Sequence, residues 1–433
     1  MRFLILFLLF SCFSYADTAT EAKPTQGSVA SYSDVTLQNW PLPPYNRWAL
    51  RNMGIMHTLM IPRAGDVFEI PRAKQQDLSS LQFEHRGKRY SVAESLAADQ
   101  TDGIVVLKGG EIVWEAYYDG FGPHDHHLWA SSTKSLIGMA AGVLVERGQI
   151  DLEKKVSDYL PELKSSAWAR ASVQDTLNMS TAIDYQEAMI DSKPGSIAFE
   201  YFKRIGLLPA FDLMMLKQDS YETPRSVRPL LQRFQANTEL PAAHTFQYQS
   251  PNVDVIGWLI ERVSGKSLKA FITEEIWSKL GAEHDAFITA DSGFVPVATG
   301  GMNTTLRDFA RFGIAVMNDG RIAGKQVFPE SAIKSITEIP AQNKLAVTRS
   351  VYRQQGSPVY DSELSAYKNF WWVHDENGIF TARGIYGQIL YVDKPNDILI
   401  ATFASAKTPS NAARETAKRR MQAFKEIAKK LAL

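Results

Sequence analysis

The sequence has a single cysteine, Cys12, which lies in the apolar run near its start. Arg2 precedes this run and a small-x-small pattern follows it, so residues 1–16 are predicted to be a signal peptide cleaved after Ala16. A chain cut there would contain no thiol, which excludes disulfides, cysteine nucleophiles and Cys-zinc sites. The alternative is a lipoprotein signal with lipid attached at Cys12. In either case the protein is expected to be exported, to the periplasm or the medium.

An excess of charge of either sign is also missing. The 47 basic and 47 acidic residues cancel, so no overall field would concentrate nucleic acid or an anionic membrane surface. Nucleic-acid binding is therefore not expected. Beyond the N-terminal run, no segment has the roughly 20 uninterrupted apolar residues of a membrane span, so none is predicted.

Several motifs of other enzyme classes are absent. The sequence contains no Gly-x-Ser-x-Gly, which argues against the α/β-hydrolase type of serine enzyme, and no glycine-rich nucleotide-binding pattern. Histidines are close together at His124, His126 and His127, but neighbouring histidines seldom converge on one ion without a distant third ligand. No metal and no organic cofactor is therefore predicted.

Strand and helix patterns alternate along the chain in a definite order. Residues 103–121 contain two β-branched, apolar segments around Gly109-Gly110, which predicts a hairpin, and a buried helix is expected over 131–147. Helical patterns dominate 155–290, and strands return over 378–406. An amphipathic helix is expected over 411–432, with its basic face in solvent.

This order of elements predicts an α/β (α+β) fold in which the first and last parts share one antiparallel sheet flanked by helices, with an inserted all-helical domain. The expected divisions are an N-terminal extension at 17–75, an α/β domain at 76–160 and 290–433, and a helical insertion at 161–289. Within the extension, residues 17–45 are expected to be an exposed leader.

Ser131 and Lys134 lie three residues apart at the start of the predicted buried helix, which places both on one face. A serine hydroxyl needs a base to become a good nucleophile, and a lysine can be that base when burial disfavours its charged form. The helix N-terminus offers N–H groups where a carbonyl oxygen becomes negative. The alternative is a helix cap followed by an unrelated lysine. The same spacing recurs where no long apolar helix begins, at Ser331-Lys334 and Ser365-Lys368.

Tyr248 precedes a second amphipathic helix, which Ser250 is predicted to cap and Pro251 to begin. A phenol on such a rigid turn can point into a neighbouring cleft. If a nearby ammonium drew off its proton, the phenol could relay a proton between the nucleophile and a leaving group. The alternative for Ser250 is a structural cap alone.

Together with Gly384-Ile385-Tyr386-Gly387-Gln388, these motifs resemble the serine β-lactamase and penicillin-binding superfamily over about residues 85–410. The sequence is most similar to the class C and esterase branch, and within it to 6-aminohexanoate-dimer hydrolases. The resemblance implies a β-lactamase/transpeptidase-like fold in which Ser131 is acylated, Lys134 activates it and Tyr248 relays the proton. The residues that the resemblance places at the oxyanion hole or the substrate are Gln388, Gly387, Tyr386, Ser250 and Tyr185.

Two departures from the superfamily motifs bear on the substrate. Ser250 stands where lactamases and carboxypeptidases usually have Asn, and Ile385 stands in place of the Lys of their Lys-Thr-Gly. The missing cation makes efficient binding of a β-lactam or peptide carboxylate unexpected.

The sequence therefore predicts a serine hydrolase that acts through an acyl-enzyme on a small ester, short amide or peptide-like substrate. The alternatives are a β-lactamase or D-alanyl-D-alanine carboxypeptidase, and a non-catalytic cell-wall-binding or scaffold protein. The sequence indicates no oligomeric state.

Overall fold

The computed structural model describes residues 34–37, 39–185, 187, 195–207, 226–240, 245–341, 343–344, 364–409 and 415–433. The predicted signal peptide, its cleavage site and Cys12 lie outside these residues. Within the described part of the chain, no helix combines the length and the apolar character that crossing a lipid bilayer requires.

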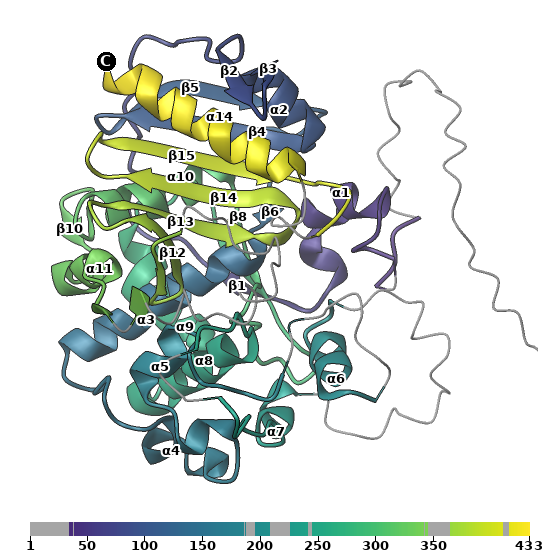
Figure 1. Cartoon of the computed structure of the whole chain (residues 1–433), viewed down its shortest axis with the longest axis vertical. Coiled ribbons are helices and arrows are strands. Elements are labelled where there is room, and N and C mark those ends of the chain that lie inside the picture. The colour runs from purple at the N-terminus through teal and green to yellow at the C-terminus, as the bar shows by residue number, and fades with distance from the viewer. Residues whose placement is uncertain are drawn as a thin grey trace, which may run out of the picture.

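A seven-stranded antiparallel sheet, in the order β11-β12-β13-β14-β15-β4-β5, forms the upper part of the molecule (Figure 1). The hairpin between β4 and β5 turns at Gly109 and Gly110, which both have positive φ (60° and 77°) and so need glycine. Strand β15 pairs with β4, with Ile400 opposite Val106, which confirms that the two ends of the chain share one sheet. The strands are β4 (Thr101–Lys108), β5 (Glu111–Tyr117), β11 (Ala366–Lys368), β12 (Trp371–Asp375), β13 (Ile379–Gly384), β14 (Gln388–Asp393) and β15 (Ile398–Ala404).

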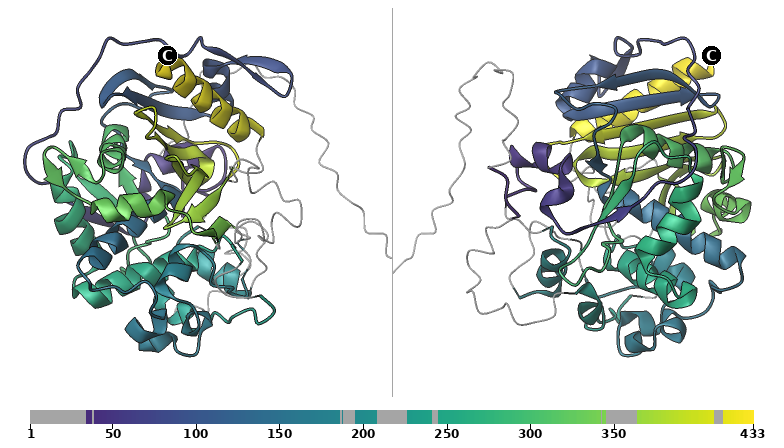
Figure 2. Two further views of the ribbon diagram at one scale, coloured as in Figure 1. Left: turned by 60° about the vertical axis from the view of Figure 1, so that its left-hand side comes forward. Right: turned by 180° about the vertical axis from the view of Figure 1, so that it is seen from behind.

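Helices cover both faces of this sheet because its strands alternate apolar side chains between two cores. On β4, Ile104 and Val106 belong to the core beneath α14 (Glu415–Ala432) and α2 (Val92–Ala98). Val105 and Leu107 belong to the larger core on the opposite face. Figure 1 shows α14 lying across the sheet, and Figure 2 shows the helices behind it. The helices of the opposite face include α3 (Thr133–Glu146) and α10 (Leu306–Met317).

The lower part of the molecule consists mainly of helices, and α3 connects it to the sheet by packing against α8 (Pro251–Ser264). The boundaries of the predicted insertion at 161–289 stay a prediction. The other helices here are α4 (Val156–Tyr159), α5 (Val173–Leu177), α6 (Ile197–Arg204), α7 (Val227–Leu231) and α9 (Leu268–Phe271).

A second, four-stranded sheet has the order β1-β7-β8-β6 and leads the chain into the site. Strand β6 (His127–Leu128) ends three residues before Ser131 and pairs with β8 (Met302–Thr304), which also pairs with β7 (Ala286–Thr289). The fourth strand of this sheet is β1 (Thr58–Ile61), which pairs with β7. The elements outside the two large sheets include α1 (Tyr45–Leu50), β2 (Gln82–His85), β3 (Lys88–Ser91), β9 (Arg321–Ile322), β10 (Lys325–Gln326) and α11 (Glu330–Thr337).

The expectation of an exposed leader up to residue 45 is wrong for Val35, Trp40 and Pro41, which are buried, whereas Leu37 and other described residues of this segment are exposed. Trp40 is only 1% exposed, and its indole N–H donates to the carbonyl oxygen of Gly206 at 3.0 Å. The hydroxyl of Tyr386 donates to the carbonyl oxygen of Pro41 at 2.7 Å. An indole buries a large apolar area, and its N–H here donates to a partner 166 residues away in the chain. This segment is therefore part of a third core cluster.

Candidate active site

Ser131 lies on a single 3₁₀ turn, Ala130–Ser132, that immediately precedes α3. The prediction placed Ser131 in the helix itself, whereas the regular helix begins two residues later. Ala130 has φ of 47°, an unusual backbone conformation for a residue with a side chain. Trp129 anchors the turn, because its backbone N–H donates to Met302 and its indole to Thr304, both at 2.7 Å. Strand β8 thus holds the half-buried Ser131 in place.

Lys134 is 1% exposed, and its amine contacts three oxygen atoms. The Nζ atom lies 3.0 Å from Ser131 Oγ and 2.7 Å from both the carbonyl oxygen and Oγ1 of Thr299. A neutral amine has two hydrogens and one lone pair. If the two Thr299 oxygens accept the two hydrogens, the lone pair faces the hydroxyl of Ser131. The arrangement therefore allows Lys134 to accept the proton of the serine.

Burial and nearby carboxylates together set the pKa of Lys134. Burial lowers the pKa of Lys134 to about 8, while the carboxylates of Glu187 and Asp254 oppose this shift. Burial also raises the pKa of Glu187, and it raises that of Asp254 to about 7. Near pH 8 about half of the Lys134 side chains are therefore neutral, whereas a free lysine would be almost fully charged.

Tyr248 joins the same group of side chains from the segment before α8. The Nζ atom of Lys134 lies 5.3 Å from the centre of its ring, and the ring stacks on Trp372 with a centroid distance of 5.3 Å and an angle of 17°. Tyr248 thus lies beside Lys134, which in turn contacts Ser131. The catalytic roles of the three residues stay predictions.

Ser250 occupies the N-cap position of α8, but its hydroxyl does not cap the helix. It donates instead to Glu187 Oε1 at 2.5 Å, and its backbone N–H donates to Oε2 at 2.9 Å. The expectation of a capping hydroxyl is therefore wrong. The physical reason is that a buried carboxylate requires donors more strongly than a helix end requires a cap. Glu187 thus ties Ser250 into the surroundings of Lys134.

The glycine-rich segment at 384–388 is a turn and not the strand expected from the sequence. Strand β13 ends at Gly384, residues 385–387 form a tight turn, and β14 begins at Gln388. A Cβ atom on Gly384 would lie 2.3 Å from the carbonyl oxygen of Trp129, so only glycine allows this turn to approach the segment before Ser131. The buried Gln388 side chain donates to Ile385 at 3.1 Å and to Ala404 at 2.7 Å. Gln388 therefore braces the turn.

The three remaining residues that were predicted to bind substrate lie in different surroundings. Gly387 has φ of 110°, and its carbonyl oxygen accepts a hydrogen bond from the buried Arg420 at 2.9 Å. Tyr386 is 1% exposed and packs against the N-terminal segment, so its placement gives no support to a substrate contact. Tyr185 is 5% exposed and packs edge-on against Tyr201, and its hydroxyl acts to lower the pKa of Glu187, which burial raises.

Four residues near Lys134 were missed in the sequence. Thr299 links the lysine to Asp254, because its backbone N–H donates to Asp254 Oδ1 at 3.2 Å, and Tyr201 donates to Oδ2 at 2.5 Å. Asp254 offered the one visible signal, since it lies one helical turn after Ser250 in the same helix. Glu187, Thr299 and Tyr201 stand in segments with no pattern that connects them to Ser131.

Known proteins share both the sequence and the architecture. A family model described as Beta-lactamase matches residues 92–424. The 6-aminohexanoate-dimer hydrolase of Paenarthrobacter ureafaciens is 30% identical over 392 residues, which cover 90% of this chain and 93% of that protein. A Bacillus anthracis structure provisionally named a 6-aminohexanoate-dimer hydrolase superposes with a TM-score of 0.79 at 27% identity, covering 93% and 99% of the two chains. A family VIII carboxylesterase shares the fold, with a TM-score of 0.52 at 15% identity over 77% of this chain and 96% of that one.

Proposed function

The chain belongs to the beta-lactamase family and is a serine hydrolase, and on this premise we propose that Ser131 is its nucleophile, Lys134 the base and Tyr248 the proton relay. The observation that carries the proposal is the 3.0 Å contact between Ser131 Oγ and the Nζ atom of the buried Lys134. A lysine whose pKa lies near 8 is neutral often enough to serve as a general base at neutral pH.

In the first half of the reaction, the neutral amine of Lys134 takes the hydroxyl proton while Ser131 Oγ bonds to the substrate carbonyl carbon. The backbone N–H groups of Ser131 and Gln388 would stabilise the negative carbonyl oxygen. The bond to the leaving group then breaks, and the leaving group takes a proton from the Tyr248 hydroxyl. The ammonium of Lys134 returns a proton to Tyr248. Water repeats these steps with Oγ as the leaving group.

For the substrate we propose an uncharged ester or a short linear amide. The relative from Paenarthrobacter ureafaciens is named for an amide substrate, the 6-aminohexanoate dimer. Ile385 supplies no cation at the position where lactamases hold a carboxylate, which favours substrates that carry no such group there. Residues 1–16 would export the enzyme, and N-terminal sequencing of the mature protein, with Asp17 as the expected first residue, tests this part.

Active-site labelling tests the nucleophile. A fluorophosphonate should modify the wild-type chain at Ser131, detected by mass spectrometry of the peptide, and should not modify Ser131→Ala. The matched control is Ser331→Ala, since Ser331 and Lys334 have the same spacing on the exposed face of α11. A wild-type chain that stays unlabelled where a control hydrolase reacts would instead favour a non-catalytic binding protein.

A substrate series tests the second part of the proposal. Rates on nitrophenyl esters, a linear aminohexanoate dimer and a β-lactam should decrease in that order. Efficient lactam turnover with poor ester turnover would contradict the role given to Ile385 while leaving Ser131 as the nucleophile.

A further inference from the structure

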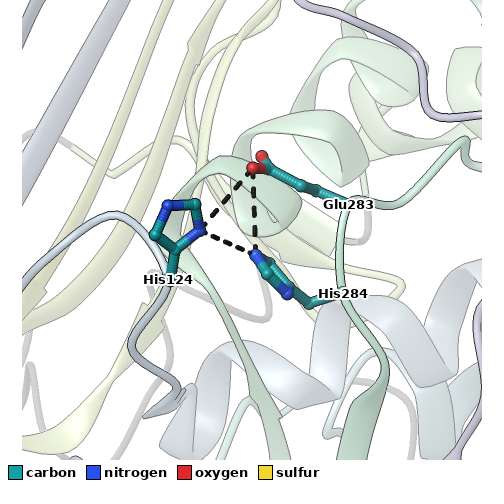
Figure 3. A group of neighbouring side chains, drawn as sticks. All are labelled: His124, Glu283 and His284. Atoms are coloured by element: carbon teal, nitrogen blue, oxygen red, sulfur yellow. Dashed lines mark hydrogen bonds and ion pairs between the residues drawn. The ribbon is translucent and has the colours of Figure 1, made fainter.

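Three side chains from two distant segments converge at one end of the four-stranded sheet. His124 precedes β6, and Glu283 and His284 precede β7 (Figure 3). Strands β6 and β7 both run antiparallel to β8 and flank it, so their leading segments arrive at the same end of the sheet. The topology thus supplies the distant ligands that the histidine-rich segment lacked in the sequence.

The spacing of the three ligand atoms suits one small ion. His124 Nδ1 lies 3.0 Å from His284 Nε2, and Glu283 Oε1 lies 3.7 Å from the first and 3.8 Å from the second. Ligands about 2.0–2.2 Å from a tetrahedral zinc ion lie about 3.3–3.5 Å from one another. Shifts of a few tenths of an ångström would therefore bring all three atoms into coordination. A hydrogen bond between the two imidazoles would explain only the shortest of the three distances.

The surroundings hold the two segments in position. The backbone N–H groups of Glu283 and His284 both donate to the carboxylate of Asp308, at 2.7 and 3.0 Å. Asp125 accepts from the backbone of Gly122 at 2.8 Å and so closes the turn that contains His124. These contacts hold the backbone of both segments and so limit the positions that the three side chains can take.

Two arginines lie near Glu283 but leave the inner oxygen available. Arg311 lies 3.5 Å from the outer oxygen, Oε2, and makes its closer bond to Asp308 at 2.8 Å. Arg307 lies 3.8 Å from Oε1 and makes its closer bond to Glu115 at 2.6 Å. A divalent ion in direct contact with Oε1 would outcompete so long a contact. The Arg311 contact leaves Oε1 free to bind an ion as a single ligand atom.

We propose that His124, Glu283 and His284 bind one Zn²⁺ ion, with water in the remaining position. His124 is 66% exposed, so solvent reaches this side of the site. Two imidazoles and one carboxylate favour zinc and similar transition ions over Mg²⁺ and Ca²⁺, which prefer oxygen ligands. The ion would tie the segment that leads to Ser131 to the segment that leads to β7, and so stabilise the fold around the nucleophile. This revises the expectation, drawn from the sequence, that no metal binds.

Calorimetric titration of metal-stripped protein with zinc chloride tests the site. We expect one Zn²⁺ per chain and binding that is about tenfold or more weaker in His124→Ala and in His284→Ala. His124→Ala removes an exposed side chain and should fold normally, and His57→Ala is the control for an exposed histidine outside the group. Zinc should also raise the midpoint of thermal unfolding of the wild type and of His57→Ala, but of neither ligand variant.

Binding of equal strength in all four proteins, or no binding at millimolar zinc, would overturn the proposal, as would equally tight binding of Mg²⁺. The outcome is independent of the proposed function, because none of the three residues belongs to the catalytic group. Metal-stripped protein should still react with fluorophosphonate at Ser131.

Discussion

Replacing Glu187 by glutamine should move the acidic side of the pH profile of hydrolysis to lower pH. The carboxylate of Glu187 raises the pKa of Lys134 against the effect of burial. Glutamine keeps an acceptor for the hydroxyl of Ser250 but removes the charge, so the pKa of Lys134 should fall below about 8. For a charge of this kind in a protein interior, a change of about one pKa unit, or 1.4 kcal/mol, is the expected size.

The effect on rate follows from the neutral fraction of the amine. With a pKa of about 8, about 9% of Lys134 is neutral at pH 7, and with a pKa of about 7 the fraction is about 50%. If the neutral amine is the base, kcat/KM at pH 7 should therefore rise in Glu187→Gln, by at most about fivefold because the amine is also a weaker base. At pH 9 both forms are about nine-tenths neutral or more, so the advantage should disappear and the variant should be no faster than the wild type.

The measurement is kcat/KM for a nitrophenyl ester from pH 5 to 10, in the wild type, Glu187→Gln and Glu187→Asp. The aspartate variant keeps the charge and should retain the position of the wild-type profile. A profile that stays in place in Glu187→Gln, or moves to higher pH, would refute the reasoning that the carboxylate holds the proton on Lys134.

Three further substitutions test the geometry of the site by ester hydrolysis. Tyr248→Phe keeps the ring and removes the proton relay, so kcat should fall by about 10²- to 10⁴-fold, and an unchanged kcat would exclude the relay. Gly384→Ala forces a methyl group against a backbone oxygen 2.3 Å away and should abolish turnover, whereas Gly148→Ala meets no atom within 4 Å and should only lower stability by about 1 kcal/mol in thermal unfolding. Thr299→Val removes one of the oxygens that orient Lys134, and kcat should fall at least tenfold with KM little changed, whereas a rise in KM alone would indicate a binding role.

The parts of the fold that the sequence predicted are those specified by neighbouring residues. The hairpin at Gly109-Gly110 follows from two glycines between β-branched segments. The prediction of an exposed leader failed at Trp40 because its indole hydrogen-bonds to Gly206, which is far away in the chain. A pattern of nearby residues carries no information about such a partner.

In the candidate site, too, contacts between neighbouring residues were predictable and contacts between distant segments were not. Ser131 and Lys134 lie within one turn of chain, so their contact could be predicted from spacing. Thr299, which holds the amine in the structure, is 165 residues from Lys134. Ser250 shows how a tertiary contact can override a local preference. Its place before the helix predicts a capping hydroxyl, whereas in the structure the hydroxyl donates to the carboxylate of Glu187. A tertiary demand of this kind, the solvation of a buried charge, exceeds the free energy of one helix cap.

The buried acids around Lys134 have a consequence that neither burial nor charge would produce alone. Burial without Glu187 and Asp254 would lower the pKa of the amine further, and a weaker base would take the serine proton less readily. An exposed lysine with the ordinary pKa of 10.5 would hold its proton at neutral pH and could not begin the reaction. With both effects present, the amine can accept the proton of Ser131 and still return one to the leaving group through Tyr248. Because the two effects oppose each other, the pH range of the proposed reaction depends on Glu187 and Asp254 as well as on Lys134.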